Sequence, residues 1–129
     1  MILDTTFVVD LLRGKYNAAS KLKQLEAENV PYAISTPTIY ELWSGLISLE
    51  KSEVEIQKTD SLIKEQIVYP LDEVSAEVAG KLDGKLIKKG TKIDPEDVMI
   101  AGIAIANNKK ILTRDEHFSR IDGLKIEVY

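Results

Sequence analysis

The chain has 129 residues, of which 44% are hydrophobic and 29% charged, and its formal net charge is −4. This composition is typical of one globular domain covering residues 1–129. Because the net charge is negative, the protein cannot bind nucleic acid through its overall charge. The lack of cysteine excludes disulfides and thiolate zinc sites. We find no signal-peptide pattern and no apolar run of about 18 residues, so we expect a cytoplasmic protein without a membrane segment.

Predicted strands and helices alternate along the chain. Short apolar runs that end at polar or turn residues predict strands at 2–3, 32–35, 67–69, 111–113 and 125–128. Capping residues and helical periodicity predict helices from Thr5 or Thr6 to Gly14, over 17–28, from Thr36 onward, over 52–65, from Asp72 to about Lys89, and from Asp94 to Asn107. This alternation predicts an α/β fold with three layers, α/β/α, around a parallel sheet of about five strands.

The most informative stretch runs from Ile93 to Phe118. It is predicted to form a helix with Asp94 at the N-cap and Asp97 in the first turn, followed at once by a buried strand. Residues 98–106 are apolar or small on every face, so this helix is expected to lie within the core. Asp115 comes just after the carboxyl end of the strand, which is the edge where open α/β sheets bind ligands.

Four carboxylates are predicted to meet at this edge. Right-handed crossovers place the strand-to-helix junctions of a parallel sheet on one side. That side would carry Asp4, Glu41, Asp97 and Asp115. Taken alone, Asp4 and Asp97 are explained as helix-capping residues, and Asp115 as a loop residue. Glu41 is harder to explain in that way, because an ionised carboxylate among apolar neighbours needs a partner.

Carboxylates brought close together repel one another unless protons or a cation join them. Ligands that are all oxygen suit Mg²⁺ or Mn²⁺ rather than zinc. A site of this kind can activate water and stabilise the leaving oxygen of a phosphodiester, which is the chemistry of metal-dependent nucleases.

The segments that carry these acids are similar to those of a known family. They are ILDTT with Asp4, PTIYEL with Glu41, DPEDVMIAGIA with Asp97 and ILTRDEHF with Asp115. Together, in this order, they resemble a PIN domain over nearly the whole chain, in particular the VapC toxins of prokaryotic toxin–antitoxin pairs.

The resemblance implies a metal-dependent endoribonuclease with a four-acid site. We expect Asp4, Glu41 and Asp97 to hold one Mg²⁺ or Mn²⁺ ion, directly or through water, and Asp115 either to complete that site or to help bind a second ion. Water activated by the ion would attack the RNA phosphate in line and leave 5′-phosphate and 3′-hydroxyl ends. Thr6 and Thr113 match hydroxyl positions that support such a site. Arg114, beside Asp115, is our candidate for a phosphate contact. The resemblance also implies the sheet order 3-2-1-4-5, a homodimer, and a cognate antitoxin whose tail can block the site.

Several residues are expected to lie outside the site. His117 is predicted to be a surface loop residue, and Asp10 to lie beyond the acidic cluster. Arg13 and Lys15, after the first helix, are placed to reach either RNA or an antitoxin.

Three alternatives compete with the toxin hypothesis. A phosphoacceptor receiver domain would need paired acids after the first strand and a lysine after a late strand, and the chain has neither. A non-catalytic interaction module on the same fold would tolerate loss of a site acid, yet all four are present. A PIN-domain nuclease that processes RNA without an antitoxin is not separated from a toxin by sequence.

Overall fold

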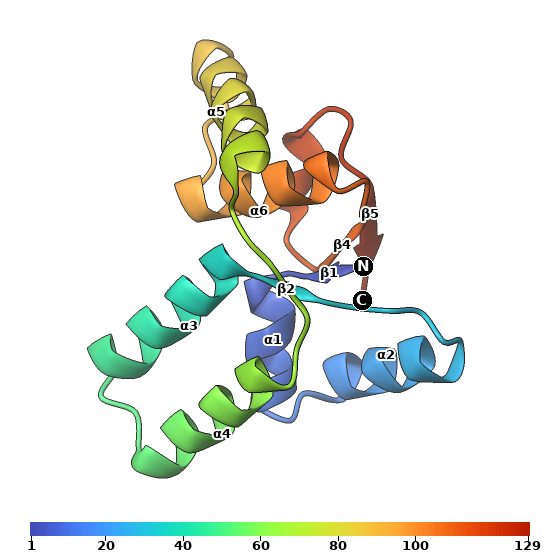
Figure 1. Cartoon of the computed structure of the whole chain (residues 1–129), viewed down its shortest axis with the longest axis vertical. Helices are drawn as coiled ribbons and strands as arrows, with labels where there is room; N and C mark the ends of the chain where they lie inside the picture. The colour runs from blue at the N-terminus through green and yellow to red at the C-terminus, as the bar shows by residue number, and fades with distance from the viewer.

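Five short strands lie in the middle of the computed structural model, which describes residues 1–129 (Figure 1). The strands are β1 (Ile2–Leu3), β2 (Ile34–Ser35), β3 (Val68–Tyr69), β4 (Ile111–Thr113) and β5 (Ile126–Val128). The helices are α1 (Thr5–Leu12), α2 (Tyr16–Ala27), α3 (Thr36–Ser48), α4 (Glu53–Lys64), α5 (Glu73–Lys88), α6 (Pro95–Ala106) and the 3₁₀ helix η1 (Glu116–Arg120), which was not predicted. The predicted α/β fold is confirmed.

The strands form two parallel sheets that meet at one bridge. One sheet has the order β1-β4-β5, and the other consists of β2 and β3. Ile2 bridges to Ala33, and the N–H of Leu3 donates to the carbonyl of Ala33 at 2.8 Å. Across this bridge the strands follow the order 3-2-1-4-5. The expectation of one continuous five-stranded sheet is therefore only partly right, because a single bridge, rather than a ladder, joins the two sheets.

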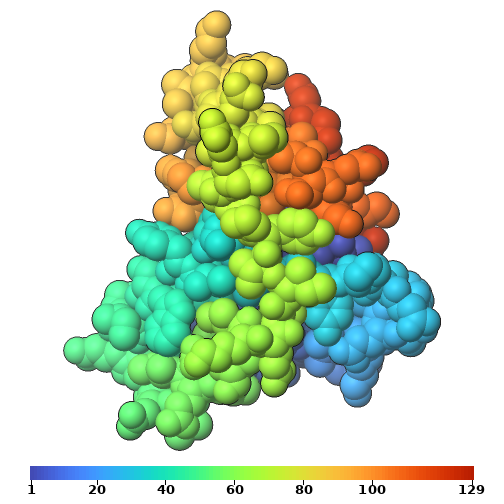
Figure 2. All heavy atoms as spheres, in the orientation of Figure 1, coloured from blue at the N-terminus to red at the C-terminus, as the bar shows by residue number.

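Helices cover both faces of the strands (Figure 1). Successive strand residues point to opposite faces. Ile2 and Ile111 accordingly pack into a core with α5 and α6, whereas Leu3 and Leu112 pack into a second core with α1, α2 and α3. The connection from α4 through β3 to α5 crosses the front of the molecule in Figures 1 and 2. The three-layer arrangement places the starts of α1 and α3 directly after β1 and β2.

The N-caps of α1 and α3 lie one or two residues before the threonines predicted to cap them. Asp4, not Thr5 or Thr6, caps α1, and its side chain accepts the N–H of Thr5. Ser35, not Thr36, caps α3 and accepts a backbone N–H of the first turn. Both capping residues have extended backbone, which an N-cap requires, because each directly continues from its strand.

Helix α6 lies in the core, as its composition predicts. Residues 98, 100–104 are buried, and the helix begins after Asp94. Asp94 is the N-cap residue, as predicted, although its side chain makes no capping hydrogen bond. No helix of the structure is both long and apolar enough to cross a bilayer.

A glycine lets α5 and α6 approach each other closely. A Cβ on Gly102 would lie 2.7 Å from the Cβ of Ala79 and 2.8 Å from the carbonyl oxygen of Ser75. A Cβ on Gly80 or Gly84, the two glycines within α5, would have nothing within 4 Å. The close contact of this helix pair thus depends on Gly102.

We expect Gly102→Ala to destabilise the protein by about 1–3 kcal/mol, because overpacking against backbone atoms forces the two helices apart. Gly80→Ala is the matched control, and it should stabilise α5 by roughly 0.5–1 kcal/mol through helix propensity. Urea denaturation of both variants measures the two changes. A Gly102→Ala protein as stable as the wild type would show that α5 and α6 can move apart at this contact without loss of stability.

Candidate active site

Asp4 is a buried carboxylate at the junction of β1 and α1. Its side chain is held by three donors, of which the N–H of Thr5 reaches Oδ1 at 2.8 Å. The hydroxyls of Thr6 and Thr113 both donate to Oδ2 at 2.7 Å. Burial raises the pKa of Asp4, and these hydrogen bonds oppose the shift without cancelling it. The side chain therefore has one fixed orientation, and β4 is tied to it through Thr113.

Glu41 on α3 is joined to Asp4 through one threonine. The hydroxyl of Thr5 donates to Oε1 of Glu41 at 2.7 Å, and the backbone N–H of Thr5 donates to Oδ1 of Asp4. Because that hydroxyl has only one proton, the hydroxyl of Thr38, 3.0 Å away, must donate to Thr5. Burial raises the pKa of Glu41, and the charge on Asp4 raises it further. Sequence reasoning missed Thr5, whose role depends on a contact between α1 and α3.

The charges of the other three acids all act on Asp97. Burial raises its pKa to about 7, with further contributions from the charges on Asp4, Glu41 and Asp115. No hydrogen bond from the protein offsets these effects. Hydrogen bonds through Thr5 and Thr113 thus link Asp4 to Glu41 and to the start of Asp115, and the charges on these three acids act on Asp97.

Asp115 closes the site after β4. Its N–H donates to the hydroxyl of Thr113 at 2.9 Å, and its Oδ1 accepts the N–H of His117 at 2.9 Å. The Nδ1 of His117 lies 3.1 Å from the same oxygen. The imidazole is 55% exposed, as expected of a surface residue, although its contact with Asp115 was not predicted.

The four acids keep oxygen atoms that are free for a metal ion. A carboxylate offers about four lone pairs, and Asp4 uses three of them within the protein. Glu41 and Asp115 each keep one oxygen without a partner from the protein, and Asp97 keeps both. These free oxygens suit Mg²⁺ or Mn²⁺. In this structure no three acidic or histidine side chains are already close enough to bind one ion together.

Arg114 does not reach the acids. Its Nε donates to Oδ2 of Asp10 at 2.7 Å, and the hydroxyl of Tyr129 donates to the same oxygen at 2.7 Å. Asp10 lies outside the acidic cluster, as predicted, but it is buried and paired. The sequence carries a signal for this, because Asp10 stands among apolar residues of α1 just as Glu41 does on α3.

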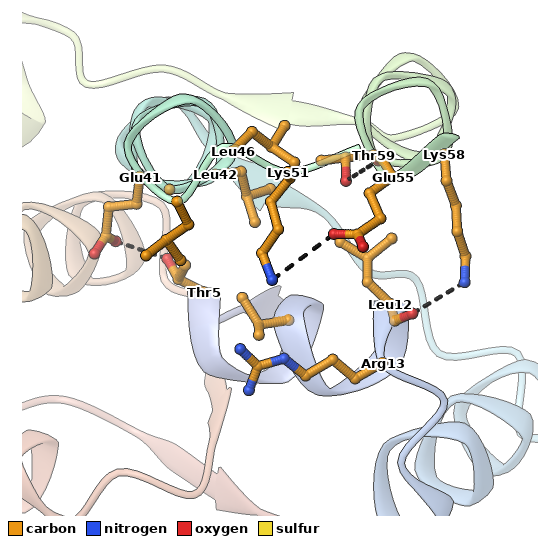
Figure 3. Close-up of a pocket in the computed structure, with 13 residues that line it drawn as sticks. Thr5, Leu12, Arg13, Glu41, Leu42, Leu46, Lys51, Glu55, Lys58 and Thr59 are labelled. Carbon is orange, nitrogen blue, oxygen red and sulfur yellow. Dashed lines mark hydrogen bonds and ion pairs between the residues drawn. The ribbon is translucent and has the colours of Figure 1, made fainter. Parts of the chain in front are cut away.

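A pocket of about 350 Å³ lies between α1, α3 and α4, next to the acids (Figure 3). Thr5 and Glu41 line the end nearest the site. Arg13, Lys51 and Lys58 stand on its walls, so this groove has cations that the acidic site lacks. Its apolar lining consists of Val9, Leu12, Leu42, Leu46 and Leu49.

Comparison with known proteins gives a consistent picture. The sequence model of the PIN domain matches residues 1–124. The chain is 28% identical to the ribonuclease VapC2 of Rickettsia felis over 127 residues, which cover 98% of this chain and 95% of that protein. It is also 28% identical to the tRNA(fMet)-specific endonuclease VapC of Salmonella typhimurium over 127 residues, with the same coverage of 98% and 95%.

The fold also matches a solved structure. VapBC2 from Rickettsia felis, bound to a DNA fragment from its promoter, superposes with a TM-score of 0.88 and 28% sequence identity. The superposition covers 99% of this chain and 97% of that one.

The raised pKa of Asp97 predicts that the protein loses stability as the pH rises. Between about pH 4 and pH 7 the folded state binds a proton at Asp97 that the unfolded state has released, so the free energy of unfolding falls over this window. Because the group is only half-buried, solvent screening limits the loss to roughly 1–2 kcal/mol.

Urea denaturation in EDTA at pH 4.5 and pH 7.5 tests this expectation. Asp97→Asn should be more stable than the wild type at pH 7.5, and the difference should shrink at pH 4.5. Glu96→Gln, one residue away on the same helix, is the control. An Asp97→Asn variant that gains no stability at the higher pH would mean that the carboxylates do not repel one another as described.

Proposed function

The chain belongs to the PIN-domain family, and on this premise we propose that it is a metal-dependent endoribonuclease, the toxin of a VapBC-type toxin–antitoxin pair. The observation that carries the proposal is the effect of the site on Asp97: burial, together with the charges on Asp4, Glu41 and Asp115, raises its pKa to about 7. Like charges gathered in a half-buried site are costly unless a cation joins them. A non-catalytic module would have no use for this arrangement.

RNA is the substrate that the relatives support. The two bacterial relatives are named as a ribonuclease and as a tRNA(fMet)-specific endonuclease. Both match this chain along nearly its whole length. We place the protein in the cytoplasm, where it would meet RNA.

Asp4, Glu41 and Asp97 would hold a Mg²⁺ or Mn²⁺ ion, and Asp115 would complete the site. The ion supplies an activated water and neutralises charge at the phosphodiester when it is bound. The protein's own contribution is orientation. Thr6 and Thr113 fix Asp4, and the fourth lone pair of that carboxylate is left free for a ligand.

A cognate antitoxin and a second copy of the chain are the proposed protein partners. The similar Rickettsia felis structure is a VapBC complex. The pocket between α1, α3 and α4 offers apolar and cationic side chains beside Glu41. A partner seated there would lie next to the catalytic acids, which supports inhibition by an antitoxin.

We expect the purified protein to cleave single-stranded RNA with Mg²⁺ or Mn²⁺ and to stop in EDTA. Asp4→Asn and Asp97→Asn should each lower the rate at least about 100-fold, because each removes a proposed ligand. Labelled RNA resolved on denaturing gels measures the rate. Glu96→Gln controls for the loss of a nearby charge. Cleavage retained in either ligand variant would remove that residue from the mechanism.

The hydroxyl of Thr113 gives a finer test of orientation. We expect Thr113→Val to lower the cleavage rate roughly 10- to 100-fold, the usual effect of losing a group that orients a ligand. Thr113→Ser keeps the hydroxyl and should retain most of the activity. Equal rates for the valine and serine variants would show that the hydrogen bond to Asp4 does not matter for catalysis.

A further inference from the structure

A second carboxylate network lies beside the acidic site and is not part of it. Asp10 on α1 is only 6% exposed, and both of its oxygens are bound. Arg114 donates to it from Nε at 2.7 Å and from Nη2 at 3.4 Å, and the hydroxyl of Tyr129 donates at 2.7 Å. The hydrogen bond from Arg114 lowers the pKa of Asp10, so this carboxylate is ionised at neutral pH.

The network adjoins the acidic site through the chain around Arg114. Thr113 and Asp115, the neighbours of Arg114 in the chain, both belong to that site, and the N–H of Asp115 donates to the hydroxyl of Thr113. Tyr129 also packs edge-on against the core residue Phe7, with ring centroids 4.8 Å apart. The network is therefore anchored to the core at Tyr129 and joined by the chain to the acidic site at Arg114.

Arg114 keeps donors that the network does not use. A guanidinium has five N–H donors, and Asp10 takes those on its Nε side. The end formed by Nη1 and Nη2 remains, and the side chain is 56% exposed. That end has the geometry that binds two oxygens of a phosphate.

Asp10 also restrains where this cation can go. Asp115, the next residue in the chain, belongs to the acidic site, and a guanidinium free of Asp10 would be drawn to those acids and would neutralise them. The buried pair with Asp10 keeps Arg114 at the rim, where it can attract phosphate to a protein of net charge −4.

We propose that Asp10, assisted by Tyr129, is a positioning residue that holds Arg114 as a phosphate-binding group beside the acidic site. The inference rests on the proposed ribonuclease function, since it assigns the phosphate to RNA. Asp10 touches neither substrate nor ion, and it acts only through Arg114.

RNA binding by non-cleaving protein tests the inference. The parent is the full chain with Asp97→Asn in Mg²⁺, and the probe is a fluorescent single-stranded RNA followed by anisotropy. Arg114→Ala and Asp10→Asn should each raise the Kd about 10-fold, the effect of losing one charge-assisted contact. Each should also lower the slope of log Kd against log salt, by about 0.7 for Arg114→Ala. Tyr129→Phe should raise the Kd less.

A positioning role has two signatures that a structural role lacks. First, removing a negative charge from the protein should by itself tighten RNA binding. A weaker complex for Asp10→Asn would therefore be opposite to the effect expected from net charge alone. The matched control is Asp60→Asn, which removes a carboxylate paired with Lys64 on α4, and it should not raise the Kd. Second, adding Asp10→Asn to Arg114→Ala should produce no further loss.

The outcomes separate this inference from the proposed function. An unchanged Kd for Asp10→Asn, or a loss that simply adds to that of Arg114→Ala, overturns the inference. If wild-type protein cleaves RNA in a parallel assay, the proposed function survives that result. A parent that does not bind RNA, together with a wild type that does not cleave it, overturns both. Tyr129→Phe keeps the test decisive if Asp10→Asn fails to fold, because a higher Kd for Tyr129→Phe supports the inference and an unchanged one overturns it.

Discussion

The structure depends on a carboxylate buried where the first strand becomes the first helix. Asp4 is 1% exposed, and burial raises its pKa even though three hydrogen bonds favour its ionised form. Those bonds decide what lies around it. Thr113 brings the end of β4 against Asp4, and Thr5 connects it to Glu41 on α3. The site is thus assembled from segments distant in sequence by hydrogen bonds to one buried anion.

This arrangement stores electrostatic repulsion in a small volume. Asp97 receives the charges of the other three acids and has no hydrogen bond to offset them. The rest of the fold has to supply the stability that the site loses. The two hydrophobic cores on either side of the strands do so, and α6, buried nearly all round, carries Asp97 on its first turn. A rigid scaffold that holds repelling groups together is what a cation-dependent site needs.

The positive charge near the site is handled differently. Arg114 is adjacent to Asp115 in the chain, yet its guanidinium pairs with Asp10 and not with the site acids. The fold thereby separates a group suited to phosphate from groups suited to a metal ion. Without that separation, the arginine and the acids would neutralise each other.

The sequence by itself determined the alternation of strands and helices and the edge at which Asp4, Glu41, Asp97 and Asp115 gather. Periodicity and right-handed crossovers are local or general rules, so they can be read without coordinates. Only the tertiary structure decided which side chains meet. Asp10 and Tyr129 are far apart in the chain, and their contact depends on strand order and helix placement that no local pattern encodes. The same reason explains why the two-sheet division escaped prediction, since the length of a ladder is set by how neighbouring strands pack.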